Sequence, residues 1–125
     1  MDDDPQLLQI LRTLLEPWGF KLTLLDNPQQ FWTILEVSNP DLLILDMEMP
    51  ELSGIELCEV VRNDPRWSEL PVLFLSVDSD AETVNRVFAA GADDYVSKPI
   101  LPPELIARVL NRLEHTRTSK ASHLI

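Results

Sequence analysis

Short apolar runs, each followed by a polar residue, alternate along this chain with segments of helical periodicity. The runs at 42–45 and 72–75 are apolar at every position, which is typical of strands buried on both faces of a parallel sheet. Strands that alternate with helices favour right-handed crossovers. The pattern therefore predicts an α/β domain: a doubly wound, open parallel sheet with helices on both faces.

Caps and turn residues place the remaining elements. Asp4 and Asp80 are expected N-caps, Pro5 suits a first helical position, and Gly91 suits a helix end. Residues 1–115 form the predicted domain, and residues 116–125 are expected to be a linker or tail. The expected helices cover 5–16, a segment opening at 27–28, a segment around 55–61, 81–90 and 102–113, and the expected strands cover 20–25, 42–45, 72–75 and 94–96.

The charge balance narrows the classes of function. Ten Lys and Arg residues stand against 21 Asp and Glu residues, for a formal net charge of −11. Such a surface is a poor platform for a phosphate backbone, so we expect no direct nucleic-acid contact, and a cation or a basic protein partner fits better. The apolar runs are too short to span a membrane, and the first residues do not resemble a signal peptide. The single cysteine, Cys58, suits a core position in a cytoplasmic protein.

Polar side chains follow the predicted strands at one edge of the sheet. In open parallel sheets, ligands bind outside the carboxyl ends of the strands. The residues expected there are Asp46 after 42–45, Ser76 after 72–75, Ser97 and Lys98 after 94–96, and Asp2, Asp3 and Asp4 before the first helix. The edge thus collects carboxylates, hydroxyl groups and one ammonium group.

Together, these groups could bind a cation and support phosphoryl transfer. Carboxylates a few ångströms apart repel unless a cation joins them, and Mg²⁺ binds through one or two carboxylates while keeping room for phosphate oxygens. A carboxylate can itself attack phosphorus. Asp46 as nucleophile, Asp3 as metal ligand, Lys98 as counter-charge and Ser76 as hydrogen-bond donor would make a complete phosphoryl-transfer site.

Three segments resemble the receiver domains of two-component response regulators, whose fold is a flavodoxin-like, CheY-like three-layer sandwich. Residues 43–54 (LILDMEMPELSG) are similar to the phosphoacceptor block, residues 91–99 (GADDYVSKP) to the block of the last strand, and residues 2–5 (DDDP) to the acidic cluster. The spacings agree as well, since Ser76 lies 30 residues and Lys98 52 residues beyond Asp46.

The resemblance implies a role for each of these residues. Asp3 and Asp46 would bind Mg²⁺ with the backbone carbonyl of Glu48, and Asp2 would assist. Asp46 would take a phosphoryl group from a histidine kinase or a phosphotransfer protein. The chain would not be an enzyme beyond its own phosphorylation and slow dephosphorylation.

The resemblance also implies a switch. Ser76 would move to the phosphoryl oxygen, and Tyr95 would turn inward in response. The face built from 81–90, 94–96 and 102–113 would then change and act on an effector domain or partner. The peptide bond between Lys98 and Pro99 would be cis.

One departure from the family concerns the first strand. Receivers carry an apolar strand before the acidic cluster, whereas here Asp2 follows Met1. We expect one module of a longer regulator, with the gap filled by residues 122–125 or by strand exchange in a dimer. A charge-paired dimer through Asp94, Glu104 and Arg108 is doubtful, because Val84 and His115 stand where basic partners are expected.

Two other functions are alternatives to the phosphoacceptor hypothesis. A haloacid-dehalogenase-like phosphatase also uses an aspartyl nucleophile and Mg²⁺, but it needs a second aspartate two residues on, where this chain has Glu48. A phosphorylation-independent interaction module of the same fold is the other alternative. The intact set of Asp3, Asp46, Ser76 and Lys98 argues against it for the parent protein, and the missing first strand leaves it open for this chain.

Overall fold

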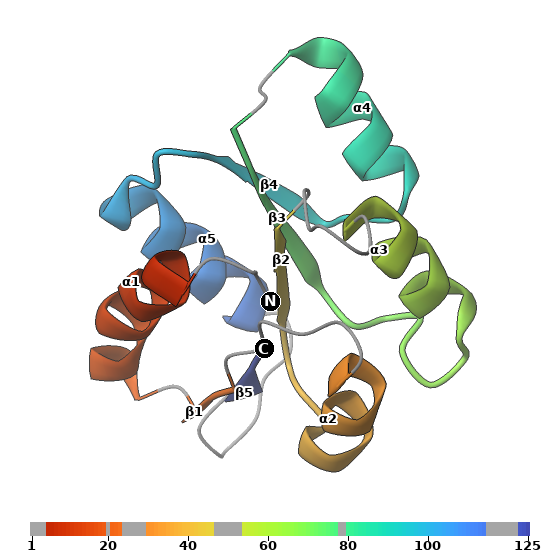
Figure 1. The fold of residues 1–125 in the computed structure, drawn as a ribbon, viewed down its shortest axis with the longest axis horizontal. Helices are drawn as coiled ribbons and strands as arrows, with labels where there is room; N and C mark the ends of the chain where they lie inside the picture. Colours follow the sequence, from red (N-terminus) through yellow and green to blue (C-terminus); the bar gives the residue numbers. More distant parts are fainter. Residues whose placement is uncertain (1–4, 20, 24–29, 47–53, 78–79, 115–122) are drawn as a thin grey trace.

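The computed structural model describes residues 5–19, 21–23, 30–46, 54–77, 80–114 and 123–125. Helices and strands alternate along this part of the chain, as the sequence predicts (Figure 1). The elements in chain order are α1 (Pro5–Leu15), the 3₁₀ turn η1 (Glu16–Trp18), β1 (Lys21–Leu22), α2 (Phe31–Ser38), β2 (Leu43–Asp46), α3 (Gly54–Asn63), β3 (Val72–Ser76), α4 (Ala81–Ala89), β4 (Asp94–Ser97), α5 (Pro102–Glu114) and β5 (His123–Leu124).

The strands form a parallel sheet in the order β1-β5-β2-β3-β4. Strands β2, β3 and β4 pair in parallel, with Phe74 opposite both Leu45 and Tyr95. Strand β5 pairs in parallel with β1, and a bridge between Leu124 and Leu42 joins this pair to β2. The doubly wound α/β architecture predicted from the sequence is confirmed.

Alternate residues of the central strands supply two cores on opposite faces of the sheet. Strand residues such as Leu45 and Phe74 pack with α2, α3 and Val87 of α4. Ile44 and Leu75 pack on the other face with α1 and α5. Figure 1 shows α1 and α5 together on one side of the sheet, with α2 and α3 on the other. This double burial explains why the runs in β2 and β3 are apolar throughout.

The C-terminal residues 123–125 lie in the centre of the sheet, between β1 and β2. Leu124 O accepts a hydrogen bond from Thr23 N at 3.1 Å. On the other side, Ile125 N donates to Leu42 O at 3.0 Å, and Ile125 O accepts from Ile44 N at 2.6 Å. Of the two expected ways to fill the missing first-strand position, the structure shows the C-terminal segment of the same chain. Part of the segment expected to be a linker or tail is therefore a strand.

Element ends agree in part with the caps expected from the sequence. The Asp80 carboxylate accepts a hydrogen bond from Thr83 N at 3.2 Å, and hydrogen bonds from the Thr83 side chain and then from its backbone N–H lower the pKa of Asp80. Gly91 follows α4 with a φ of 108°, a region that glycine adopts without strain. Strand β1 is described only at 21–22 of the expected 20–25, and α2 is described from Phe31. The expected cap Asp4 and residues 24–29 lie outside the described residues.

Candidate functional site

Asp46 and Lys98 meet at the carboxyl ends of the strands. Asp46 is the last residue of β2 and is only 5% exposed. Lys98, which follows β4, places its Nζ atom 2.9 Å from Asp46 Oδ1. Two residues that sequence reasoning assigned to one site thus form an ion pair, with the lysine side chain 21% exposed.

Ser76 lies beside this pair because of the strand register. It ends β3, is buried, and stands opposite Ser97 of β4. Lys98 N then donates a hydrogen bond to Ser76 O at 2.7 Å, which ties the residue after β4 to the end of β3. The Lys98–Pro99 peptide bond is cis, the isomer that the resemblance implies. Three of the four main residues expected in the site therefore come together at this edge.

The start of α3 approaches the backbone of Asp46 closely. A Cβ atom built on Gly54 would lie 2.2 Å from Asp46 O and 3.1 Å from the Phe74 ring, so no side chain fits there. Gly54 thus lets α3 pack directly behind the candidate nucleophile. The glycine belongs to the segment that resembles the phosphoacceptor block, but only the tertiary contact reveals this role.

The chemistry of the described groups fits one ligand of a divalent cation. Asp46 offers a carboxylate at the edge of the sheet, and Mg²⁺ can bind through one or two carboxylates and waters. The other expected ligands, Asp2, Asp3 and the carbonyl of Glu48, lie outside the described residues. Within the described residues, no group of three or more His, Cys, Asp or Glu side chains is placed to hold a metal ion.

Tyr95 has its side chain turned toward the core. It lies on β4 and packs against the core that β2 and β3 share with α2 and α3. Its hydroxyl is buried and has no hydrogen-bond partner within the described part of the chain. The inward rotation that the resemblance implies on phosphorylation stays a prediction.

The charges expected at a dimer face pair within the chain. The guanidinium of Arg108 contacts the Asp94 carboxylate and lies 3.4 Å from Glu104 Oε1. Arg112 Nε lies 3.6 Å from Asp94 Oδ2. The two pairs with Asp94 join α5 to β4, the pair with Glu104 lies within α5, and nothing here tests a dimer through these charges.

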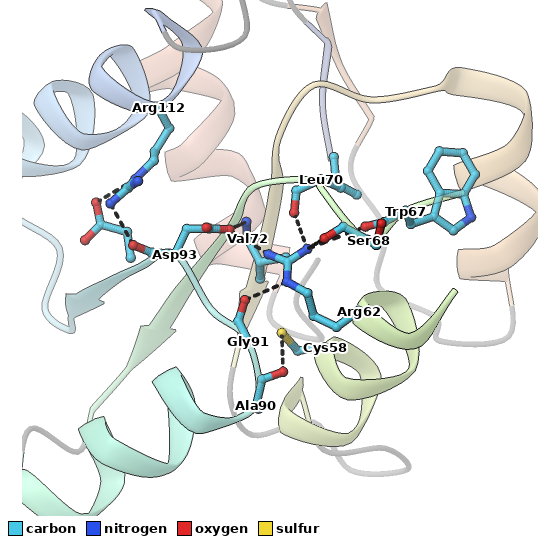
Figure 2. A network of polar contacts seen from close by, with 11 residues as sticks. Cys58, Arg62, Trp67, Ser68, Leu70, Val72, Ala90, Gly91, Asp93 and Arg112 are labelled. Atoms are coloured by element: carbon cyan, nitrogen blue, oxygen red, sulfur yellow. Dashed lines mark hydrogen bonds and ion pairs between the residues drawn. The ribbon is translucent and has the colours of Figure 1, made fainter. Parts of the chain in front are cut away.

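A polar network around Arg62 lies at the other end of the sheet (Figure 2). Its guanidinium donates to the backbone oxygens of Gly91 at 2.8 Å and Leu70 at 2.7 Å, and it pairs with Asp93 Oδ2 at 2.6 Å. Asp93 Oδ2 also accepts from Val72 N at 2.8 Å. The network joins α3 to the amino ends of β3 and β4. Sequence reasoning missed it, because backbone acceptors leave no side-chain signal.

No helix among the described residues is long and apolar enough to cross a membrane.

The sequence matches the family model of the response regulator receiver domain over residues 1–110. The chain belongs to this family. Asp46 lies in the segment that resembles the phosphoacceptor block, and Lys98 lies in the segment that resembles the block of the last strand.

Curated relatives support the assignment. The receiver is 54% identical over 117 residues to "Protein RcaC" of Microchaete diplosiphon, which covers 94% of this chain and 18% of the relative. It is 37% identical over 124 residues to "DNA-binding response regulator MtrA" of Mycolicibacterium smegmatis, covering 99% of this chain and 53% of the relative. The chain thus spans about half or less of the length of these relatives.

The structure is also similar to a solved receiver. The signal receiver domain of a signal transduction histidine kinase from Syntrophus aciditrophicus superposes with a TM-score of 0.85 at 30% identity. The alignment covers 97% of this chain and 92% of that one. The CheY-like receiver fold expected from the sequence is therefore shown.

Proposed function

We propose that the chain is a Mg²⁺-dependent phosphoacceptor switch in which Asp46 takes a phosphoryl group from a histidine kinase or phosphotransfer protein. The observation that carries this proposal is the Asp46–Lys98 pair, 2.9 Å apart at the carboxyl edge of the sheet. A buried carboxylate with one fixed ammonium group beside it is a nucleophile held next to the positive charge that a phosphoryl group needs.

The transfer can be written with this chain's own groups. A carboxylate oxygen of Asp46 forms a bond to phosphorus, and the bond from phosphorus to the donor's leaving group breaks. The Lys98 ammonium is within reach of the oxygens that carry negative charge during the transfer. Bound Mg²⁺ would supply further charge neutralisation at Asp46, with Asp2, Asp3 and the Glu48 carbonyl as the proposed additional ligands.

The neighbouring residues support a switch between two arrangements. Ser76 lies at the end of β3 beside Lys98, from where its hydroxyl would bond a phosphoryl oxygen. Tyr95 is turned inward with an unpartnered hydroxyl among the described residues. A phosphoryl group that draws Ser76 toward it would favour the inward position of Tyr95 over an outward one. A bias of about 1–3 kcal/mol is typical of such coupling.

The output would pass through the face formed by α4, β4 and α5, on which Tyr95 and the Asp94–Arg108 pair lie. We propose that this face acts on an effector domain or a partner protein in the cytoplasm. The net charge of −11 speaks against direct binding of nucleic acid by this domain. The relative MtrA is named as DNA-binding, and this chain covers 53% of its length.

Intact mass after incubation with acetyl phosphate and Mg²⁺ tests the proposal. The chain should gain one phosphoryl group, about 80 Da, and no adduct should form when Mg²⁺ is chelated before acetyl phosphate is added. Asp46→Asn should give no adduct. Asp41→Asn, which alters a carboxylate just before β2, is the matched control and should be phosphorylated like the wild type.

Two results would contradict the proposal. A folded wild-type chain that stays unmodified would favour the phosphorylation-independent module. Sustained turnover of a phosphomonoester would favour the phosphatase alternative, since a phosphoacceptor keeps its adduct and hydrolyses it slowly.

A further inference from the structure

The C-terminal segment, residues 123–125, makes the contacts of an inserted strand. Leu124 O accepts from Thr23 N beside β1, and the pair Lys21–His123 extends this register. Ile125 N and O bond to Leu42 O and Ile44 N beside β2. Main-chain bonds on both sides are the recognition mode of proteins that bind a peptide by adding it to a sheet.

Successive side chains of the segment complete both cores. Leu124 is fully buried with the residues of α1 and α5 on one face of the sheet. Ile125 is buried with the residues of α2 and α3 on the other face. The slot between β1 and β2 therefore selects an extended peptide with two consecutive aliphatic residues, one for each face.

We propose that the slot between β1 and β2 is a strand-acceptor site, which binds the C-terminal segment of this chain in parallel and also accepts it from a second copy. The hydrogen bonds and the two buried side chains define the site, and none of these contacts depends on the covalent connection to α5. The same contacts can therefore form when another copy supplies the segment, as in strand exchange.

The link to α5 decides which copy fills the slot. A short connection holds the segment at an effective concentration of roughly millimolar, so the intramolecular strand is favoured in dilute solution. A peptide added to the wild type must compete with the chain's own segment at that effective concentration. A chain whose own segment cannot dock should bind the same peptide much more readily.

The test uses the whole chain of residues 1–125 with Leu124→Asp. This change puts a carboxylate in the core with α1 and α5, which disfavours docking of the chain's own segment. The probe is a synthetic peptide of residues 119–125. Hydrogen exchange at the Thr23 and Ile44 amides reports occupancy, because both donate to the segment.

We expect Leu124→Asp to lose protection at Thr23 and Ile44 by about tenfold or more, the scale of a lost native contact. In the variant, about 100 μM peptide should restore this protection and raise Tm. In the wild type, the same peptide should change neither quantity. Leu101→Asp, a change at a 60% exposed site, should keep full protection without peptide. A peptide with Asp in place of the residue matching Leu124 should not rescue.

The experiment remains informative if Leu124→Asp unfolds. A peptide that binds only the folded chain must then refold the variant by mass action, and circular dichroism measures this refolding. Unchanged protection and Tm in Leu124→Asp would overturn the proposal. So would failure of the peptide to restore either signal at millimolar concentration. All these readouts are independent of phosphorylation.

Discussion

The ammonium group of Lys98 lies 2.9 Å from Asp46 Oδ1, although 52 residues separate the two along the chain. The parallel register places the ends of β2, β3 and β4 side by side, and the Lys98 N–H bond to Ser76 O holds the residue after β4 at that edge. The pair serves both folding, where it neutralises a buried carboxylate, and the proposed transfer, where it supplies positive charge.

Lys98→Met should lower both stability and phosphorylation rate. The variant leaves the buried Asp46 carboxylate without its cation, so the free energy of unfolding should fall by about 1–3 kcal/mol. Phosphorylation by acetyl phosphate should slow by roughly 100-fold, the usual effect of losing one charge-stabilising donor. Urea unfolding and intact mass measure the two effects.

A double-mutant cycle supplies the control for the pair. In the Asp46→Asn background, Lys98→Met should cost less stability, because no carboxylate is left unpaired. Arg12→Met breaks the exposed pair with Glu16 and should change the free energy of unfolding by less than about 1 kcal/mol. Equal costs of Lys98→Met in both backgrounds would show that the pair does not stabilise the fold.

Gly54→Ala should displace the backbone of Asp46 in the candidate site. The new Cβ would meet the Asp46 carbonyl oxygen at 2.2 Å, so α3 or the end of β2 has to shift. We expect a loss of about 1–3 kcal/mol in unfolding free energy, typical of overpacking, together with slower phosphorylation. Thermal unfolding and the acetyl phosphate assay measure them.

Gly19→Ala is the matched control for Gly54. Gly19 has a φ of 83° and no atom within 4 Å of its built Cβ, so alanine there has only the conformational cost of about 1–2 kcal/mol. It should leave the phosphorylation rate unchanged. If Gly54→Ala phosphorylates at the wild-type rate, the close approach does not position Asp46.

Arg62→Met should be strongly destabilising. It leaves Asp93 without its cation and removes donors from the backbone oxygens of Gly91 and Leu70 (Figure 2). Since several partly buried acceptors lose a charged donor together, we expect a loss of about 3 kcal/mol in urea unfolding. Arg62→Lys should recover only part of it, because an ammonium group cannot reproduce the planar fork.

Arg66→Met tests whether any arginine in this region has such an effect. Arg66 pairs with Glu36 and Asp64, but its side chain is 57% exposed, so its loss should cost less than about 1 kcal/mol. Similar losses for Arg62→Met and Arg66→Met would contradict the structural role of the network.

Cys58 should make stability fall at alkaline pH. Burial raises the pKa of the Cys58 thiol to about 11 from its ordinary value of 9.0. Below pH of about 9 both states keep the proton, and the stabilising contribution is complete. Between the two values the unfolded chain releases the proton first, so the free energy of unfolding falls as pH rises, by at most about 3 kcal/mol.

Urea unfolding of wild type and Cys58→Ala at pH of about 7.5, 9 and 10.5 measures this effect. The stability difference between the two chains should shrink as pH rises, and thiol reagents should modify native Cys58 slowly near pH 8. A difference that stays constant over the range would mean that the thiol ionises alike in both states.

Much of this structure could be anticipated from local pattern. The unbroken apolar runs of β2 and β3 identify strands buried on both faces, and the residues after them mark the functional edge. Asp80 as an N-cap is equally local, since its partner Thr83 N lies three residues away. In each case the deciding contacts are periodic or near in sequence, so the residue types alone carry the information.

Other features depended on segments that meet only in the folded chain. Arg62 binds backbone oxygens that any residue could offer, and Gly54 matters because α3 lies against Asp46 O. Residues 122–125 are one of the two expected fillers of the first-strand position, but Leu124 and Ile125 form a pattern too short to decide between the two. The contacts with β1 and β2 decide it. Hydrogen-bonding edges and close approaches are properties of two surfaces together, so neither segment encodes them alone.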